Sequence, residues 1–181
     1  LKKKIINKDI FLNSINFYLN KYPISIINIK KKDKKFHARF SAKERVYKYK
    51  VINRFSNLVL NKNKAWHIKK KLNLKLIKKI KKILEGTHDF STFRASSCNA
   101  KTPIKTIKKI SIQKSKQKII FTFVSKSFLQ QQVRSMVGCL KYLGEGKWTF
   151  EDFKKSFFSK KRSKCAPPAP PHGLYLFRVK Y

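Results

Sequence analysis

Acidic residues are scarce in this 181-residue chain, which has 8 of them against 46 lysines and arginines and a formal net charge of +38. A cluster of carboxylates that could hold magnesium is therefore hard to build. Cysteine is also scarce: there are 3, none forms a Cys-x-x-Cys pair, and the 4 histidines are scattered. This spacing argues against a zinc site and fits reduced thiols in a cytoplasmic protein. We expect no metal and no cofactor.

Long uncharged apolar runs are absent as well. No stretch of about 18 such residues exists, so the sequence predicts no membrane span. The chain starts Leu-Lys-Lys-Lys without the apolar segment of a secretory signal. It contains no Walker A loop, no Gly-x-Gly-x-x-Gly, no Gly-x-Ser-x-Gly and no His-Glu-x-x-His. The common signatures of nucleotide-binding proteins, serine hydrolases and metalloproteases are thus missing.

The residues that are present indicate a folded and strongly basic chain. Hydrophobic residues make up 41% of it, including 15 phenylalanines, which argues against disorder and allows one domain with a buried core. The charge suggests a polyanionic partner, although lysine, isoleucine, asparagine and phenylalanine all have A- and T-rich codons and would also accumulate in a low-GC genome. Arginine is the more informative cation because its fork suits phosphate. The arginines are Arg39, Arg45, Arg54, Arg94, Arg134, Arg162 and Arg178.

Hydrophobic periodicity predicts an α+β fold, an antiparallel sheet with helices packed on one face. The predicted helices cover residues 9–20, 73–85, 128–143 and 149–158. Asp9 and Asn73 are the predicted caps of the first two, and Thr149 with Asp152 forms a capping-box pattern at the fourth. The predicted strands are 24–30, 45–53, 104–113, 118–125 and 174–181, with an irregular segment at 55–71.

Two aromatic positions stand out on the strand 45–53. Its two-residue period places Tyr47, Tyr49 and Val51 on one face, where packing in the core is the simplest interpretation. A tyrosine can also stack on an unpaired RNA base, and its hydroxyl can take part in proton transfer. The strand alone does not choose between these roles.

Three further positions have two interpretations each. Arg134 lies in the predicted helix 128–143, either on an exposed polar strip or at a functional site. The loop from Asp89 to Arg94 is polar, and Asp89 can cap a turn there. Leu174 begins the last predicted strand, where ordinary packing and a place in a binding pocket fit the pattern equally well.

Three separated segments carry motifs that can be compared with known families. They are Phe36-His-Ala-Arg-Phe-Ser-Ala-Lys-Glu-Arg-Val-Tyr-Lys-Tyr49, Phe128-Leu-Gln-Gln-Gln-Val-Arg-Ser-Met-Val-Gly138 and Pro170-Pro-His-Gly-Leu-Tyr-Leu176. In this order they resemble the tRNA pseudouridine synthases of the TruA type, and the resemblance covers essentially the whole chain. It implies a pseudouridine synthase catalytic-domain fold and the isomerisation of uridines 38, 39 and 40 in the tRNA anticodon stem-loop. It also implies that the intact protein is a homodimer that needs no cofactor.

The resemblance assigns roles to individual residues. It implies that Tyr47, the first tyrosine of an Arg-x-Tyr-x-Tyr pattern, contacts the target uracil, and that Leu174 forms the apolar wall of the uracil pocket. It implies that Arg134, in Val-Arg-x-x-Val-Gly, pairs with the catalytic aspartate and keeps that carboxylate ionised. The helix motif reads Phe-Leu-Gln-Gln-Gln-Val-Arg, whereas relatives often carry His or Met before the Val. The expected RNA-binding residues are Arg94, Arg39 and Arg45.

The catalytic aspartate itself is missing. In the family it lies in a Gly-Arg-Thr-Asp motif before the first segment, and none of the 8 acidic residues here follows Gly-Arg-Thr. We therefore expect residues 1–35 to be a remnant of the N-terminal subdomain and residues 36–181 to be the C-terminal subdomain. We expect the chain to be a fragment that lacks the nucleophile and does not isomerise uridine by itself. Two alternatives stay open: a catalytically inactive RNA-binding remnant, and an unrelated basic protein such as a ribosomal protein.

Overall fold

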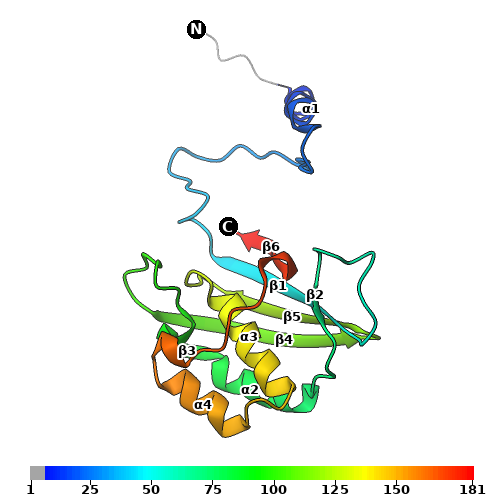
Figure 1. Cartoon of the computed structure of the whole chain (residues 1–181). Helices are drawn as coiled ribbons and strands as arrows, with labels where there is room; N and C mark the ends of the chain where they lie inside the picture. The colour runs from blue at the N-terminus through cyan, green and yellow to red at the C-terminus, as the bar shows by residue number, and fades with distance from the viewer. Residues whose placement is uncertain (1–6) are drawn as a thin grey trace. The chain divides into compact units, whose positions relative to one another are not determined.

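The computed structural model of the chain describes residues 7–181 (Figure 1). Contacts within the chain divide it into two units, Leu1–Ala38 and Arg39–Tyr181. We predicted a boundary after residue 35, and the first six residues of that predicted remnant lie outside the described residues. Within residues 7–181, no helix is both long enough and apolar enough to cross a membrane.

The described part of the first unit contains helix α1 (Lys8–Leu19). Its cap is Asn7 and not Asp9, so this prediction is wrong. The Asn7 Oδ1 accepts hydrogen bonds from the amides of Asp9 and Ile10 at 2.9 and 3.3 Å. Asp9 instead lies in the first turn, where a negative charge is favourable next to the positive end of the helix dipole.

The strand predicted at residues 24–30 is also wrong, because this segment forms no strand in the structure. The Asn16 side chain, and not a neighbouring strand, forms hydrogen bonds with the backbone of this segment. The Asn16 Oδ1 accepts from the Ile26 amide and the Asn16 Nδ2 donates to the Ile26 carbonyl, both at 2.8 Å. Asparagine side chains can compete in this way with the hydrogen bonds of a sheet.

A six-stranded sheet organises the second unit. Its strands are β1 (Glu44–Asn53), β2 (Trp66–Ile68), β3 (Gly86–Asp89), β4 (Ile104–Ser115), β5 (Lys118–Ser125) and β6 (Leu174–Lys180). One edge of β1 pairs with β5, beyond which β4 and β3 follow. The other edge pairs with β6 along its first half and with β2 at its end. β1 therefore pairs with three strands, β2, β5 and β6.

The sheet is mostly antiparallel, as predicted, and β2 adds one parallel pairing with β1. The parallel pair exists because residues 54–65 carry the chain back before β2 begins, as parallel pairing requires a long connection. β2 itself lies inside the segment 55–71 that we predicted to be irregular. It places the Trp66 ring edge-on to the Tyr49 ring, with centroids 6.2 Å apart.

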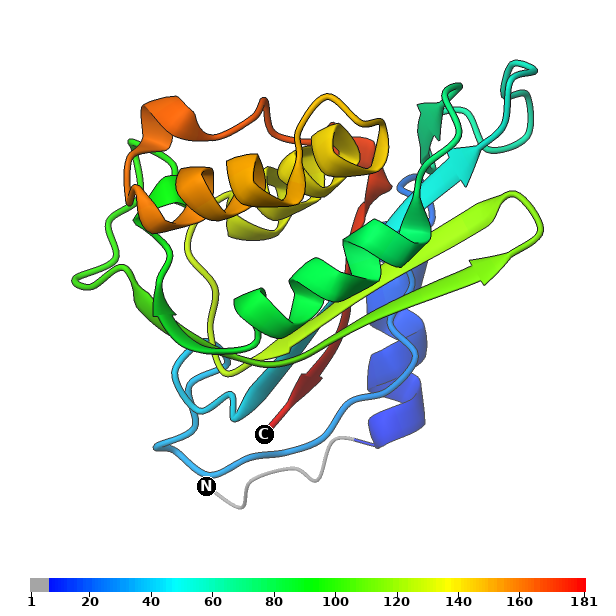
Figure 2. The same cartoon turned by 90° about the horizontal axis from the view of Figure 1, so that it is seen from below.

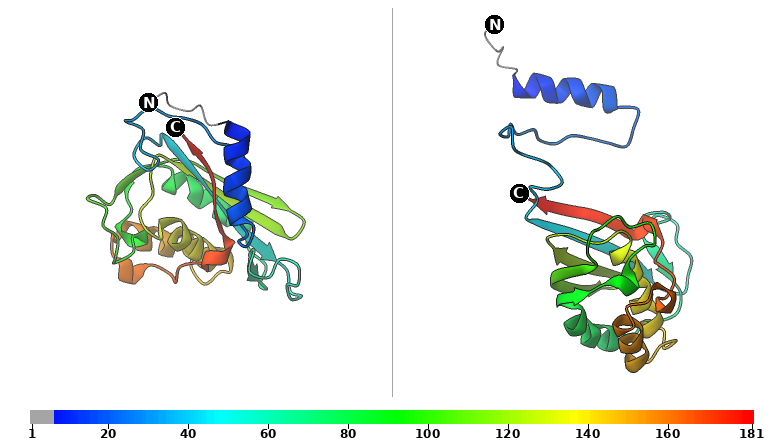
Figure 3. Two further views of the ribbon diagram at one scale, coloured as in Figure 1. Left: turned by 90° about the horizontal axis from the view of Figure 1, so that it is seen from above. Right: turned by 90° about the vertical axis from the view of Figure 1, so that its left-hand side faces the viewer.

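Helices α2 (Leu74–Leu84), α3 (Gln132–Gly144) and α4 (Phe150–Phe158) cover one face of the sheet (Figures 1 and 2). The covered face is apolar: the β1–β5 register sets Tyr49 beside Phe121 and Val51 beside Ile119, and all four side chains are buried. The side view in Figure 3 shows the sheet and the helices of residues 39–181 as two layers. The predicted α+β fold with helices on one face is confirmed.

Two predicted helix starts are confirmed. The Asn73 Oδ1 accepts a hydrogen bond from the Leu76 amide at 3.1 Å at the start of α2. At α4, Thr149 and Asp152 form the reciprocal capping box. These caps satisfy amide groups that have no partner in the first helical turn.

Helix α3 begins later than predicted, at Gln132 and not at Phe128. Gln131 has φ +61°, in the left-handed region that a non-glycine residue adopts at a cost. The apolar pattern of the sequence continues through this turn because Leu129 is buried. Hydrophobic spacing alone therefore does not reveal where the helix starts.

Candidate functional site

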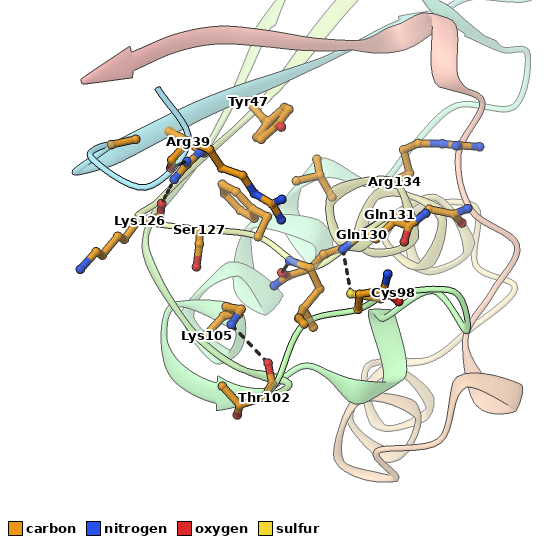
Figure 4. Close-up of a pocket in the computed structure, with 18 of the residues that line it drawn as sticks. Arg39, Tyr47, Cys98, Thr102, Lys105, Lys126, Ser127, Gln130, Gln131 and Arg134 are labelled. Atoms are coloured by element: carbon orange, nitrogen blue, oxygen red, sulfur yellow. Dashed lines mark hydrogen bonds between the residues drawn. The ribbon is translucent and has the colours of Figure 1, made fainter. Parts of the chain in front are cut away.

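A cavity of about 850 Å³ opens in the second unit among β1, the loop 98–102 and the turn that leads into α3 (Figure 4). Tyr47 enters it from β1, whereas Gln130 and Gln131 enter it from the turn before α3. Its lining also contains Leu174 from the start of β6. The cavity thus brings together residues from the beginning, middle and end of this unit.

The wall of the cavity is basic. Among residues 39–181, no acidic side chain lines it. The cationic lining residues are Arg39, Arg45, Lys101, Lys105, Lys126 and Arg134. A concave surface of one charge concentrates the field of its cations, so the cavity suits an anionic ligand such as a nucleotide chain.

Tyr47 and Tyr49 lie on the same strand but have different environments. Tyr47 is half-buried and lines the cavity, with its ring edge-on to Phe128 at a centroid distance of 5.2 Å. Tyr49 is fully buried, and its hydroxyl donates to the Pro170 carbonyl at 2.7 Å. The structure therefore leaves part of Tyr47 at the cavity and buries Tyr49 in the core.

Burial raises the pKa of the Tyr49 hydroxyl well above its ordinary value, and the nearby Arg134 charge opposes this rise only in part. We expect Tyr49→Phe to cost about 1 kcal/mol at neutral pH through the lost hydrogen bond. The pKa of the Tyr49 hydroxyl is higher in the folded chain than in the unfolded chain. The protonated hydroxyl therefore contributes its full stability below the unfolded pKa of about 10, and this contribution is lost as the pH rises above that value. Urea unfolding should show the difference between wild type and variant shrinking above that pH. A difference that grows there would contradict this assignment.

Arg134 fastens the segment that leads to Leu174. Its Nε donates to the Ala169 carbonyl at 2.6 Å, and the Ala169 amide donates to the Arg134 carbonyl at 3.0 Å. Figure 4 shows the side chain running from α3 toward that segment. The Nη1 and Nη2 groups make no hydrogen bond within residues 7–181. Arg134 therefore positions the cavity wall and still has donors to offer.

Two glycines let this segment lie against the rest of the unit. A Cβ at Gly138 would collide with the Pro167 carbonyl oxygen, and a Cβ at Gly173 would lie 2.7 Å from the Tyr49 Cζ. The close approach sets the position of Leu174, the next residue after Gly173.

The other predicted arginines have mainly structural partners. Arg45 donates to the carbonyls of Lys126 and Arg39, which ties two rims of the cavity together. Arg94 does not line the cavity. Its Nη2 donates to the carbonyls of Cys98 and Ala100 at 2.6 and 2.8 Å, so it holds the loop 98–102 in place. Its predicted contact with RNA stays a prediction.

The sequence did not predict the loop 98–102 as part of the site. Cys98 lies in the cavity wall, and its Sγ accepts from the Gln130 amide at 3.4 Å. Burial opposes ionisation of this thiol, but hydrogen bonds from the backbone of Ala100 and Gln130 and the charge of Arg94 lower its pKa. No local pattern marks this loop, since it reaches the cavity only through the fold.

The acidic residues among residues 39–181 do not line the cavity, and three of them have structural roles. Asp89 accepts from the Ser91 amide at 2.8 Å, which confirms its predicted turn cap. Burial disfavours its charge, but the hydrogen bonds from Ser91 lower its pKa. Glu44 forms an ion pair with Lys180 at 2.9 Å, and the Glu85 Oε1 accepts from the Ile110 amide at 2.7 Å.

No group of three or more metal-binding side chains exists within residues 7–181. The thiols of Cys139 and Cys165 lie near each other, with their sulfurs 3.5 Å apart. Two thiols without further ligands do not make a zinc site.

Comparisons with known proteins give a consistent result. Residues 80–181 match the family model described as tRNA pseudouridine synthase. A tRNA pseudouridine synthase A from Pelagibacter ubique is 57% identical over 180 residues, which cover 99% of this chain and 73% of that protein. Proteins of the same name from Ehrlichia chaffeensis and Parvibaculum lavamentivorans are 43% and 39% identical, over 93% and 96% of this chain and 69% and 70% of their own lengths.

Proposed function

The chain belongs to the tRNA pseudouridine synthase A family, and from this membership we propose that residues 39–181 hold the target uridine and its RNA during the reaction. A protein of this family is an isomerase that modifies tRNA, which removes the alternative of an unrelated basic protein. The finer points are part of the proposal: the substrates are uridines 38, 39 and 40 of the anticodon stem-loop, and the intact protein is a cytoplasmic homodimer.

The observation that carries the proposal is the position of Tyr47 in a basic cavity opposite residues of α3 and beside Leu174. A flat base can stack on the Tyr47 ring, and Leu174 offers it an apolar wall. Arg39, Lys105 and Lys126 line the same cavity, and their charges support contacts with the phosphates of the RNA. A uridine turned out of its stem or loop would fit this arrangement.

The reaction defines what else is needed. The bond between N1 of uracil and C1′ of ribose breaks, the base turns, and a bond forms between C5 and C1′. The C5 proton then leaves and N1 ends protonated, so no cofactor is consumed. A carboxylate acts as the nucleophile that helps to detach the uracil from its ribose. We propose that the free Nη groups of Arg134 orient that carboxylate. No acidic residue among residues 39–181 lines the cavity, and no acidic residue of the chain follows Gly-Arg-Thr, so we propose that the nucleophile is not among the residues of this chain.

The test uses two versions of an anticodon stem-loop RNA, one with uridine at position 39 and one with an abasic site there. We expect the chain to bind the uridine version more tightly, and Tyr47→Ala to remove about a 10-fold preference, as loss of one stacked base predicts. Fluorescence anisotropy at several salt concentrations measures both affinities. We also expect no conversion of uridine, read by chemical modification and primer extension.

Lys79→Ala is the matched control, since Lys79 is exposed on α2 and does not line the cavity. It should weaken the binding of both RNAs equally and leave the preference for the uridine RNA unchanged. A preference that survives in Tyr47→Ala would overturn the proposed base contact. Conversion of uridine by this chain would overturn the claim that it lacks the nucleophile. Base-dependent binding without conversion is the result that the proposal expects.

A further inference from the structure

Gln132 has a hydrogen-bond donor without a partner. It is the first residue of α3, is fully buried and belongs to the lining of the cavity. Its Nε2 is enclosed and has no hydrogen-bond partner within residues 7–181. Buried polar groups are almost always paired in folded proteins, so each exception needs an explanation.

The orientation of this amide is fixed. The Gln132 Oε1 accepts a hydrogen bond from the buried Leu129 amide at 2.8 Å. A flip would set the two donors, the Leu129 N–H and the Gln132 NH₂, against each other. The Nε2 must therefore be the atom that remains unpaired, and it needs an acceptor that these residues do not supply.

The backbone before Gln132 is strained in a way that supports a functional position. Gln131 adopts φ +61°, and such strain is found at binding sites more often than elsewhere. The turn leaves Gln130 and Gln131 exposed at the cavity while Gln132 points inward. Because of this one turn, Gln130 and Gln131 are exposed and Gln132 is buried.

We propose that Gln132, which precedes the Val where relatives often carry His or Met, is a specificity-determining residue particular to this chain. Its Nε2 donates a hydrogen bond to a carbonyl oxygen of the pyrimidine base that enters the cavity. The proposal rests on the proposed function of residues 39–181. The cations of the wall suit phosphates, but a neutral amide donor suits the neutral carbonyl groups of uracil. Because Nε2 is enclosed in the ligand-free chain, the exposed turn at Gln130 and Gln131 must shift when the base enters.

The first experiment measures the same two RNAs with the variant Gln132→Met, which has a similar length and no donor. We expect a 5- to 10-fold loss of affinity for the uridine RNA and no change for the abasic RNA. If Gln132 acts only through its hydrogen bond with the Leu129 amide, the variant should instead change the melting temperature and weaken the binding of both RNAs equally. Equal weakening, or an unchanged preference for uridine, overturns the proposal.

The second experiment uses the wild-type chain, so it does not depend on the variant folding. With isotope-labelled glutamine, the side-chain NH₂ resonance of Gln132 should move downfield on binding the uridine RNA and not on binding the abasic RNA. The resonances of Gln113 and Gln117, in and after β4, should stay in place. A Gln132 resonance that does not distinguish the two RNAs overturns the proposal.

The two proposals fail separately. If Tyr47→Ala loses the preference for uridine and Gln132→Met keeps it, the proposed function stands and the role of Gln132 is wrong. If the wild-type chain shows no preference, both proposals are wrong.

Discussion

Gly138→Ala is expected to destabilise the fold by about 3 kcal/mol, the upper part of the range for overpacked sites. In an ordinary helix this change would stabilise, since alanine is favoured over glycine by up to about 1 kcal/mol. Here the new Cβ meets the carbonyl oxygen of Pro167, a backbone atom that cannot rotate away. The segment that positions Leu174 must move as a whole. Urea unfolding followed by circular dichroism measures the change.

Gly144→Ala is the matched control in the same helix. Its new Cβ would meet the side-chain ends Ile77 Cδ1 at 2.7 Å and Leu72 Cδ2 at 3.1 Å, which can shift. We expect a change of less than about 1 kcal/mol, because the helix preference for alanine offsets the crowding. If both variants are equally stable, the close contact between α3 and the segment at Pro167 is not as tight as described.

Arg134→Met is the second change with a large expected effect. It should cost about 2 kcal/mol in unfolding experiments, because the Ala169 carbonyl loses a charge-assisted hydrogen bond. Arg134→Lys should recover only part of this, since an ammonium group cannot reproduce the planar fork. We also expect Arg134→Met to reduce the preference for uridine RNA by several-fold, because the wall at Leu174 loses its anchor.

Arg178→Met provides the comparison, since Arg178 is exposed on β6 and does not line the cavity. It should leave stability within about 0.5 kcal/mol of wild type, as surface changes usually do. The salt dependence of RNA binding should fall in both arginine variants. A similar stability for Arg134→Met and Arg178→Met would show that the bond to Ala169 contributes little.

Periodic apolar patterns and capping motifs were the reliable parts of the sequence. Helix α2 with its Asn73 cap, helix α4 with its Thr149 capping box, and the strands β4 and β5 all lie where these patterns predict. Each of these signals is local, so a few neighbouring residues determine the outcome.

The predictions failed where a distant or neighbouring side chain competed with the local pattern. The Asn16 side chain replaces a strand partner at Ile26, and Asn7 takes the cap that Asp9 could have formed. β2 becomes a strand only because β1 has a free edge at Val51 to Asn53. None of these outcomes follows from propensity alone, which tertiary contacts override.

The candidate site divides in the same way. The resemblance to the TruA type picked out Tyr47, Arg134 and Leu174, and the cavity brings these three together. The loop at Cys98 could not be found from sequence, because its place in the wall depends on Arg94 and on the amide of Gln130. The unpaired donor of Gln132 is visible only when the partners of every buried atom are known.

The pairing of β1 with β6 has a consequence for folding. It joins Glu44 to Lys180, whereas β4 and β5 are joined by the two-residue turn between Ser115 and Lys118. The entropy lost on closing a loop grows with its length, and sheets built from distant segments form more slowly than local hairpins. Tyr47 and Leu174 lie on these two distant strands, so the walls that would hold a base meet only through the longest-range contact of the sheet.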